Sequence, residues 1–356
     1  MSVASAKTLY ELTRCGLLTH EQLATLIRTC YWGQFPTTAF VQEMLRSRGW
    51  MTGYQFEKVM HGHVDGLRVG RYLIIEKLGE GGFGKVYRAR ETDGMQREVT
   101  LKLMRKELTQ DPQVMQRFLR EMMVVGRLNH RHLVSGLDAS HQGKLWYLVL
   151  EYVRGIDLKH LVARRGPLPW PEACEYARQA ADGLQYILQS GLIHRDIKPA
   201  NLLREDPTGT IKILDLGLAK LEEVFSGRKT DANITTGLMI GTPEFMAPEQ
   251  FEDAHTLDIR ADLYSLGCVL YFLLAGHPPF QGNNAVEVLQ GVLEETPPDL
   301  MHLRPDIPPQ IGTLVNRMMS RRQTDRPTEP IEVSRFLKSI LSTVPPLDPS
   351  SDMVQL

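Results

Sequence analysis

The stretch GLIHRDIKPANLL, from Gly191 to Leu203, sets a cluster of polar side chains between apolar ones. It places a carboxylate at Asp196, a cation at Lys198 and an amide at Asn201. Polar groups held against a core are costly unless they are hydrogen-bonded or put to use. A carboxylate can accept a proton, a cation can neutralise a phosphate, and an amide oxygen can bind a hard metal ion. The pattern therefore indicates a turn that is held in place for chemistry on a charged group.

A further carboxylate, Asp215, ends the apolar run IKIL and opens the tight turn Asp-Leu-Gly. Aspartate is common in turns, so a purely local role is one interpretation. Together with Asn201 it could instead supply oxygen ligands to Mg²⁺, which keeps several waters and needs few protein groups.

The glycine-rich loop LGEGGFGKV has the spacing G-x-G-x-x-G at Gly79, Gly81 and Gly84. The same letters fit the start of a Walker A loop, but Val86 stands where a Ser/Thr hydroxyl is required, and a strand follows where a helix is needed. A dinucleotide-binding fold is excluded as well, because it too needs a helix after the glycine loop. Two interpretations remain: a loop between antiparallel strands whose backbone lies over phosphates, or a tight hairpin with spare glycines.

Two charges at apolar positions are expected to pair. Lys102 lies in the strand-like run REVTLKLM, and Glu121 lies on the apolar stripe of a predicted helix. Pairing would offset the cost of burying both charges and would aim the ammonium group at a phosphate under the glycine loop. The alternative is a lysine whose charged end reaches solvent and a glutamate on the surface.

Hydrophobic periodicity predicts a strand-rich segment followed by a helix-rich one. The expected strands cover residues 71–82, 85–90, 97–104 and 144–153, with Asp93-Gly94 as a hairpin turn and a helix over 111–128. The helix-rich part contains a helix over 170–191, a short strand over 209–217, a helix that starts near Ala261 and is stopped by Gly276 and the two prolines after it, and further helices to Leu341. This order predicts an α+β, bilobal architecture.

Residues 1–70 are predicted to form a small all-α domain. GLLTHEQL and GWMTGYQF share a pattern in which Thr19 with Gln22, and Thr52 with Gln55, match a capping box at a helix start. The domain is either an interaction or regulatory module or simply packs on its neighbour. At the other end, residues 342–356 are rich in Pro and Ser and are expected to be disordered.

Composition narrows the class of protein. The chain has 356 residues and a formal net charge of -1, so no global field attracts nucleic acid or an anionic membrane. Its four cysteines are scattered without a C-x-x-C pair, which argues against a disulfide framework or a zinc site and favours the cytoplasm. The longest apolar block, LGCVLYFLLAG, is shorter than the ~20 residues that span a bilayer and predicts a buried helix.

Taken in order, these motifs resemble the protein kinase family, in the serine/threonine branch that has eukaryotic-like members in bacteria. The resemblance rests on LGEGGFGKV, Lys102, Glu121, HRDIKPAN, DLG, GTPEFMAPE and DLYSLG, and covers residues 71–341. It implies a β-rich N-lobe over 71–154 and a helical C-lobe over 155–341. It also implies transfer of the γ-phosphate of ATP to Ser/Thr hydroxyls of protein substrates, with Mg²⁺ as cofactor.

The resemblance also implies roles for single residues. Asp196 would accept the substrate proton, Lys198 would neutralise the moving phosphate, and Lys102, fixed by Glu121, would hold the α and β phosphates. Two residues would bind magnesium: Asn201 and Asp215. The implied ATP-binding set is Leu78, Gly79, Gly81, Gly84, Val86, Thr100, Lys102, Leu150, Glu151 and Val153. Thr100 stands where Ala is usual, which could weaken or reshape ATP binding.

Three further residues have structural roles by resemblance. Asp262 would bond the backbone of the loop that contains His194, Arg195 and Asp196 (the HRD loop). Glu249 would pair with Arg326. The alternatives are a helix cap for Asp262 and a surface charge for Arg326.

Regulation is expected in the segment between Asp215 and Glu249. Arg195 resembles the arginine that binds an activation-loop phosphate, so phosphorylation is predicted at Thr235 or Thr236, with a homodimer as a possible route to autophosphorylation. The alternative is a loop whose threonines are only solvated. The competing function is a pseudokinase that binds nucleotide or partners without transferring phosphate.

Overall fold

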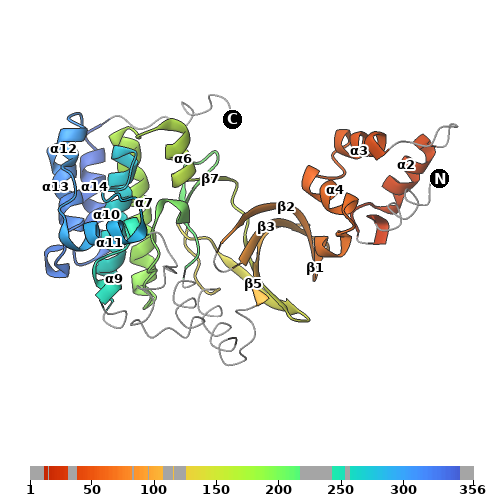
Figure 1. Ribbon diagram of the computed structural model, residues 1–356, viewed down its shortest axis with the longest axis horizontal. Coiled ribbons are helices and arrows are strands. Elements are labelled where there is room, and N and C mark those ends of the chain that lie inside the picture. The colour runs from red at the N-terminus through yellow and green to blue at the C-terminus, as the bar shows by residue number, and fades with distance from the viewer. Residues whose placement is uncertain are drawn as a thin grey trace. The chain divides into compact units, whose positions relative to one another are not determined.

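The structure is a computed structural model, and each of its two compact units is described by itself (Figure 1). The first unit comprises residues 1–119 and 136–152, and the second comprises 120–135 and 153–356. Within them the structure describes residues 12–14, 16–30, 38–81, 84–94, 96–106, 115, 126–216, 243–252 and 257–344.

A six-stranded antiparallel sheet, in the order β1-β2-β3-β4-β6-β5, forms the centre of the first unit. Its strands are β1 (Arg68–Val69), β2 (Tyr72–Glu80), β3 (Gly84–Glu91), β4 (Glu98–Met104), β5 (Gly136–Gln142) and β6 (Leu145–Glu151). The four strands predicted between residues 71 and 153 are confirmed as β2, β3, β4 and β6, with ends that differ by one to a few residues.

Alternation along these strands divides the sheet into two faces. Tyr87, Ala89, Val99, Leu101 and Val149 all point to one face and are buried there. These side chains form one hydrophobic cluster with buried residues of the N-terminal segment, among them the leucines at 12, 17, 18, 26 and 45.

The N-terminal segment is helical, as predicted. Its elements are α2 (His20–Cys30), α3 (Thr38–Ser47), α4 (Gly53–Met60) and the 3₁₀ turn η1 (Val64–Leu67). Both capping boxes are confirmed: Thr19 Oγ1 accepts from the Gln22 backbone N–H at 3.2 Å, and Thr52 Oγ1 accepts from that of Gln55 at 3.2 Å. The glutamine amides reach back to the N–H groups of Thr19 and Thr52 at 2.8 and 3.0 Å. Since this segment shares its core with the sheet, the domain boundary at residue 70 stays a prediction.

The second unit is mainly helical, and its core lies around two long helices, α7 and α10. Its α-helices are α6 (Leu158–Arg165), α7 (Trp170–Gln189), α9 (Glu249–Glu252), α10 (Ile259–Ala275), α11 (Ala285–Glu294), α12 (Leu300–Leu303), α13 (Pro309–Met318) and α14 (Pro330–Leu341). Figure 1 shows α7 and α10 among the helices of this unit, and both α10 and α14 pack against α7. As the apolar sequence predicts, α10 is buried nearly all round, and it ends at Gly276, whose φ of 84° is left-handed.

A small sheet and several 3₁₀ turns are also described in this unit. The strands, in the order β7-β8-β9, are β7 (Gly155–Asp157), β8 (Leu202–Glu205) and β9 (Ile211–Ile213). The turns are η3 (Pro199–Asn201), η4 (Pro243–Phe245) and η5 (Gln323–Asp325). The predicted helix over 111–128 lies largely outside the described residues, as does most of the tail over 342–356. Among the helices that are described, none combines the length and apolarity that a bilayer span requires.

Candidate active site

The strand register gathers predicted nucleotide residues on the face of the sheet opposite the N-terminal helices. Val86 of β3 lies directly opposite Lys102 of β4, and Thr100 lies opposite Leu150 of β6. Directly paired residues share a face, and so do residues two apart on one strand. Val86, Thr100, Lys102 and Leu150 therefore project to the same side of the sheet.

The glycine loop connects β2 and β3. Gly79 pairs with Val86, and a bulge between Lys77 and Gly79 leaves Leu78 as an extra residue whose side chain is 46% exposed. A Cβ built on Gly84 would lie 1.8 Å from the carbonyl oxygen of Leu103, so the neighbouring strand itself requires a glycine there.

Gly79 and Gly81 differ from Gly84 in this respect. A Cβ on either would meet no atom of the described chain within 4 Å. The backbone of Gly81 is nevertheless fixed by two hydrogen bonds. The Gly81 N–H donates to the carbonyl oxygen of Gly84 at 2.9 Å, and the Arg105 side chain donates to the carbonyl oxygen of Gly81 at 2.8 Å. The protein's own packing therefore does not explain glycine at 79 and 81.

Lys102 is 7% exposed, an unusual burial for an ammonium group. Its predicted partner, Glu121, lies outside the described residues. Of the predicted hinge residues, Glu151 ends β6 opposite Val99 in the first unit, and Val153 is a buried residue of the second.

The HRD loop holds the Asp196 carboxylate between two donors. The ammonium of Lys198 donates to Oδ1 and Oδ2 at 2.9 and 2.8 Å. The amide of Asn201 donates to Oδ2 and to the Asp196 carbonyl, both at 2.8 Å. The predicted trio of Asp196, Lys198 and Asn201 therefore forms one hydrogen-bonded cluster.

A buried aspartate on α10 fixes the backbone of this loop. Asp262 is 1% exposed and accepts the backbone N–H groups of His194 and Arg195, both at 2.7 Å, which confirms its predicted role. Burial raises the pKa of the Asp262 carboxyl, while the two short N–H bonds act in the opposite direction. Arg195 has a φ of 68°, a conformation that is costly for a non-glycine residue and that persists only where its surroundings enforce it.

The same loop is joined to the segment that carries Asp215. His194 is fully buried and its Nε2 bonds the carbonyl of Leu214 at 2.8 Å, while the Leu214 N–H donates to the Asn201 carbonyl at 2.9 Å. Asp215 follows with a φ of 60°, again left-handed for a non-glycine residue. These bonds place the backbones of Asn201 and Asp215 on adjacent segments.

This donor set fits a magnesium ion. Both N–H groups of the Asn201 amide are engaged with Asp196, so its carbonyl oxygen is the atom left for a cation. The Asp215 carboxylate would supply a second oxygen, the type of ligand that Mg²⁺ prefers.

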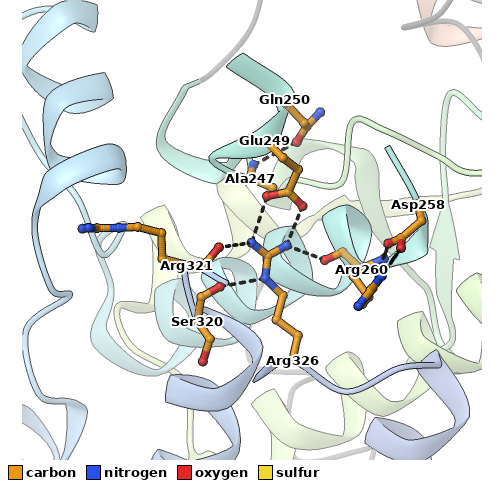
Figure 2. Close-up of polar contacts among 8 residues, drawn as sticks. All are labelled: Ala247, Glu249, Gln250, Asp258, Arg260, Ser320, Arg321 and Arg326. Carbon is orange, nitrogen blue, oxygen red and sulfur yellow. Dashed lines mark hydrogen bonds and ion pairs between the residues drawn. The ribbon is translucent and has the colours of Figure 1, made fainter. Parts of the chain in front are cut away.

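A buried ion pair anchors α9 in the helical unit (Figure 2). Arg326 is 1% exposed and donates to the two oxygens of Glu249 at 2.6 and 2.9 Å. Its other N–H groups donate to the carbonyls of Ser320, Arg260 and Arg321. The predicted Glu249–Arg326 pair is confirmed, and the surface-charge alternative for Arg326 is wrong.

Sequence reasoning gave no role to two residues that support the loop. His194 holds Leu214, as described above, and Gln250 of α9 donates to the Arg195 carbonyl at 2.9 Å. The apolar frame around His194 was a usable signal of burial, whereas nothing in the sequence near Gln250 indicates its partner. The predicted phosphorylation sites Thr235 and Thr236 lie outside the described residues.

Comparison with known proteins agrees with this geometry. The model of the "Protein kinase domain" family matches residues 72–341. The serine/threonine-protein kinase pkn3 of Myxococcus xanthus is 37% identical over 264 residues, which cover 72% of this chain and 47% of that protein. PknL of Mycobacterium tuberculosis is 35% identical over 271 residues, which cover 76% of this chain and 65% of that protein.

Among solved structures, the PknI kinase domain of Mycobacterium tuberculosis matches with a TM-score of 0.59 and 26% identity, over 77% of this chain and 98% of that domain. The chain thus spans about half to two thirds of the length of the two curated relatives named above. The resemblance inferred from the motifs is confirmed, and the chain belongs to the protein kinase domain family, in a bacterial serine/threonine-kinase-like branch with a β-rich and a helical lobe.

Proposed function

We propose that this chain is an ATP-dependent serine/threonine protein kinase. The observation that carries the proposal is the HRD loop, in which Lys198 and Asn201 hold the Asp196 carboxylate while Asp262 fixes the backbone beneath it. Phosphoryl transfer needs mainly positioning and neutralisation of charge, and this loop offers a proton acceptor, a cation and a metal-binding amide on one rigid support.

In this mechanism Asp196 orients the substrate hydroxyl and accepts its proton as the oxygen attacks the γ-phosphate. Lys198 lies within 2.9 Å of the same carboxylate and neutralises the phosphate during transfer. The hydrogen bonds from Lys198 and Asn201 hold the Asp196 carboxylate in a fixed orientation. The moving phosphate ends on the Ser or Thr oxygen, and ADP leaves.

The nucleotide is assigned to the sheet face that carries Val86, Thr100 and Leu150, with Lys102 for the α and β phosphates. Open space around Gly79 and Gly81 supports a backbone that lies close over phosphates. Asn201 and Asp215 would hold Mg²⁺, which when bound neutralises the phosphate oxygens and orients them. Glu151 and Val153 would bond the adenine, beside Leu78 and Leu150.

Phosphorylation at Thr235 or Thr236 remains part of the proposal, with Arg195 as the cation that binds the phosphate. A homodimer is one way to bring two active sites and two such loops together. The scattered cysteines and near-neutral charge support a cytoplasmic protein that acts on proteins rather than nucleic acid.

The test is incubation with γ-labelled ATP, Mg²⁺ and a generic basic protein substrate, followed by phosphoamino-acid analysis. Label is expected on Ser and Thr only, with loss of transfer when Mg²⁺ is chelated and in Lys102→Met. A protein that binds ATP but transfers no more label than Lys102→Met would support the pseudokinase alternative instead.

A further inference from the structure

The capping box at the start of α4 does more than begin a helix, because its side chains also bond the sheet. The side-chain amide of Gln55, 4% exposed, donates to the Ile74 carbonyl of β2 at 2.7 Å. The Thr52 hydroxyl donates to the next carbonyl, that of Ile75. Each side chain therefore serves the helix start and the strand at once.

These two carbonyls lie at an irregularity of β2. Ile74 pairs with Ala89 and Glu76 with Arg88, so Ile75 is an extra residue in a β-bulge. Successive carbonyls of a regular strand point to opposite edges of the sheet, and the bulge lets two consecutive ones face the same helix start. Beyond Leu73, β2 no longer pairs with β1, and α4 packs beside this part of the strand instead.

The anchored bulge is close in sequence to the glycine loop. A second bulge leaves Leu78 as the extra residue, immediately before Gly79. A shift of one residue in strand register moves every following side chain to the opposite face. Whatever fixes the register at Ile75 therefore also fixes the face on which Leu78 lies and the position where the glycine loop begins.

We propose that Gln55 and Thr52 are positioning residues for nucleotide binding: they hold the β2 bulge in register and so set the position of Leu78 and the glycine loop. The effect on nucleotide binding rests on the proposed kinase function, whereas the bonds from Gln55 and Thr52 to β2 do not depend on it. It gives the N-terminal helical segment a defined task at the nucleotide-binding face, although its helices cover the opposite face of the sheet.

The chain offers a matched control in the Thr19–Gln22 box. It has the same Thr-x-x-Gln pattern and the same two local bonds. Within the described residues, the side-chain bonds of Thr19 and Gln22 stay inside their own helix start. A change in that box should weaken a helix start to a similar degree without disturbing β2.

The experiment compares Gln55→Met with Gln22→Met in the full chain. Gln55→Met keeps the size of the side chain but leaves the Ile74 carbonyl and the Thr52 N–H without their partner. The KM for ATP is expected to rise roughly 3- to 10-fold, the scale of one lost buried hydrogen bond, with kcat within about 2-fold. Amides of residues 74–80 should exchange hydrogen faster than in the wild type, and Gln22→Met should show neither effect.

A second pair keeps the test valid if Gln55→Met does not fold. Thr52→Val removes the hydroxyl and is expected to reproduce both effects, whereas Thr52→Ser retains it and should restore the wild-type values. Equal behaviour of the variants at the two boxes, or unchanged exchange over residues 74–80, would overturn the inference. If the wild type itself transfers no phosphate, the proposed function fails, while hydrogen exchange still decides whether α4 holds β2.

Discussion

At the scale of single residues, Arg326 of the helical unit is a buried charge in which every donor has a partner. All five N–H groups of Arg326 are used, two by Glu249 and three by backbone carbonyls, and its guanidinium lies 4.8 Å from the ring centre of Tyr264. A pair of this kind adds little over an apolar core, yet breaking it leaves an uncompensated charge. Its task is to hold α9, from which Gln250 reaches the HRD loop.

Arg326→Met is therefore expected to lower the free energy of unfolding by about 3–5 kcal/mol, because Glu249 would stay buried without a partner. Equilibrium urea unfolding followed by circular dichroism measures the loss. The matched control is Arg317→Met, since Arg317 and Glu332 form a pair at 3.6 Å that is 50% and 39% exposed. That change should cost no more than about 1 kcal/mol. Equal losses in the two variants would contradict this account.

At the scale of elements, the sequence predicts best those with a clear hydrophobic period. The strands β2, β3, β4 and β6, and the helices α7 and α10, lie where periodicity placed them. The sequence of β5, GLDASHQ, lacks any alternation of apolar residues, and its exposed strand was not predicted. Gln55 shows a different reason why a contact is missed. The capping box already accounts for a glutamine at this position, so nothing in the sequence indicates that its side chain also bonds the carbonyl of Ile74.

The glycine loop yields a prediction in which stability and nucleotide binding separate. Gly84→Ala should lower the free energy of unfolding by at least about 2 kcal/mol, because its Cβ would overlap the Leu103 carbonyl at 1.8 Å. Gly79→Ala meets open space and should change stability by no more than about 1 kcal/mol, yet raise the KM for ATP several-fold.

Thermal unfolding and ATP-dependent initial rates measure the two quantities on the same preparations. A large loss of stability in Gly79→Ala would show that the protein's own packing requires this glycine. Wild-type stability in Gly84→Ala would refute the close strand approach.

At the scale of the whole molecule, the proposed reaction draws on residues of both units. The sheet unit carries the residues assigned to the nucleotide except Val153, and the helical unit carries Val153, Asp196, Lys198, Asn201 and Asp215. The sequence predicts these residues because its short motifs follow one another in the order that the protein kinase family shares. It could not predict that the N-terminal helices share one hydrophobic core with the sheet, since nothing in an amphipathic helix specifies which surface it covers.

The most direct test of the central claim is the rate of phosphate transfer by Asp196→Asn at saturating ATP and Mg²⁺, measured beside its affinity for ATP. Asparagine keeps the shape of the side chain but cannot accept the substrate proton. The account predicts a fall in kcat of roughly 10²–10⁴-fold with ATP affinity close to that of the wild type. Transfer at the wild-type rate by Asp196→Asn would contradict it.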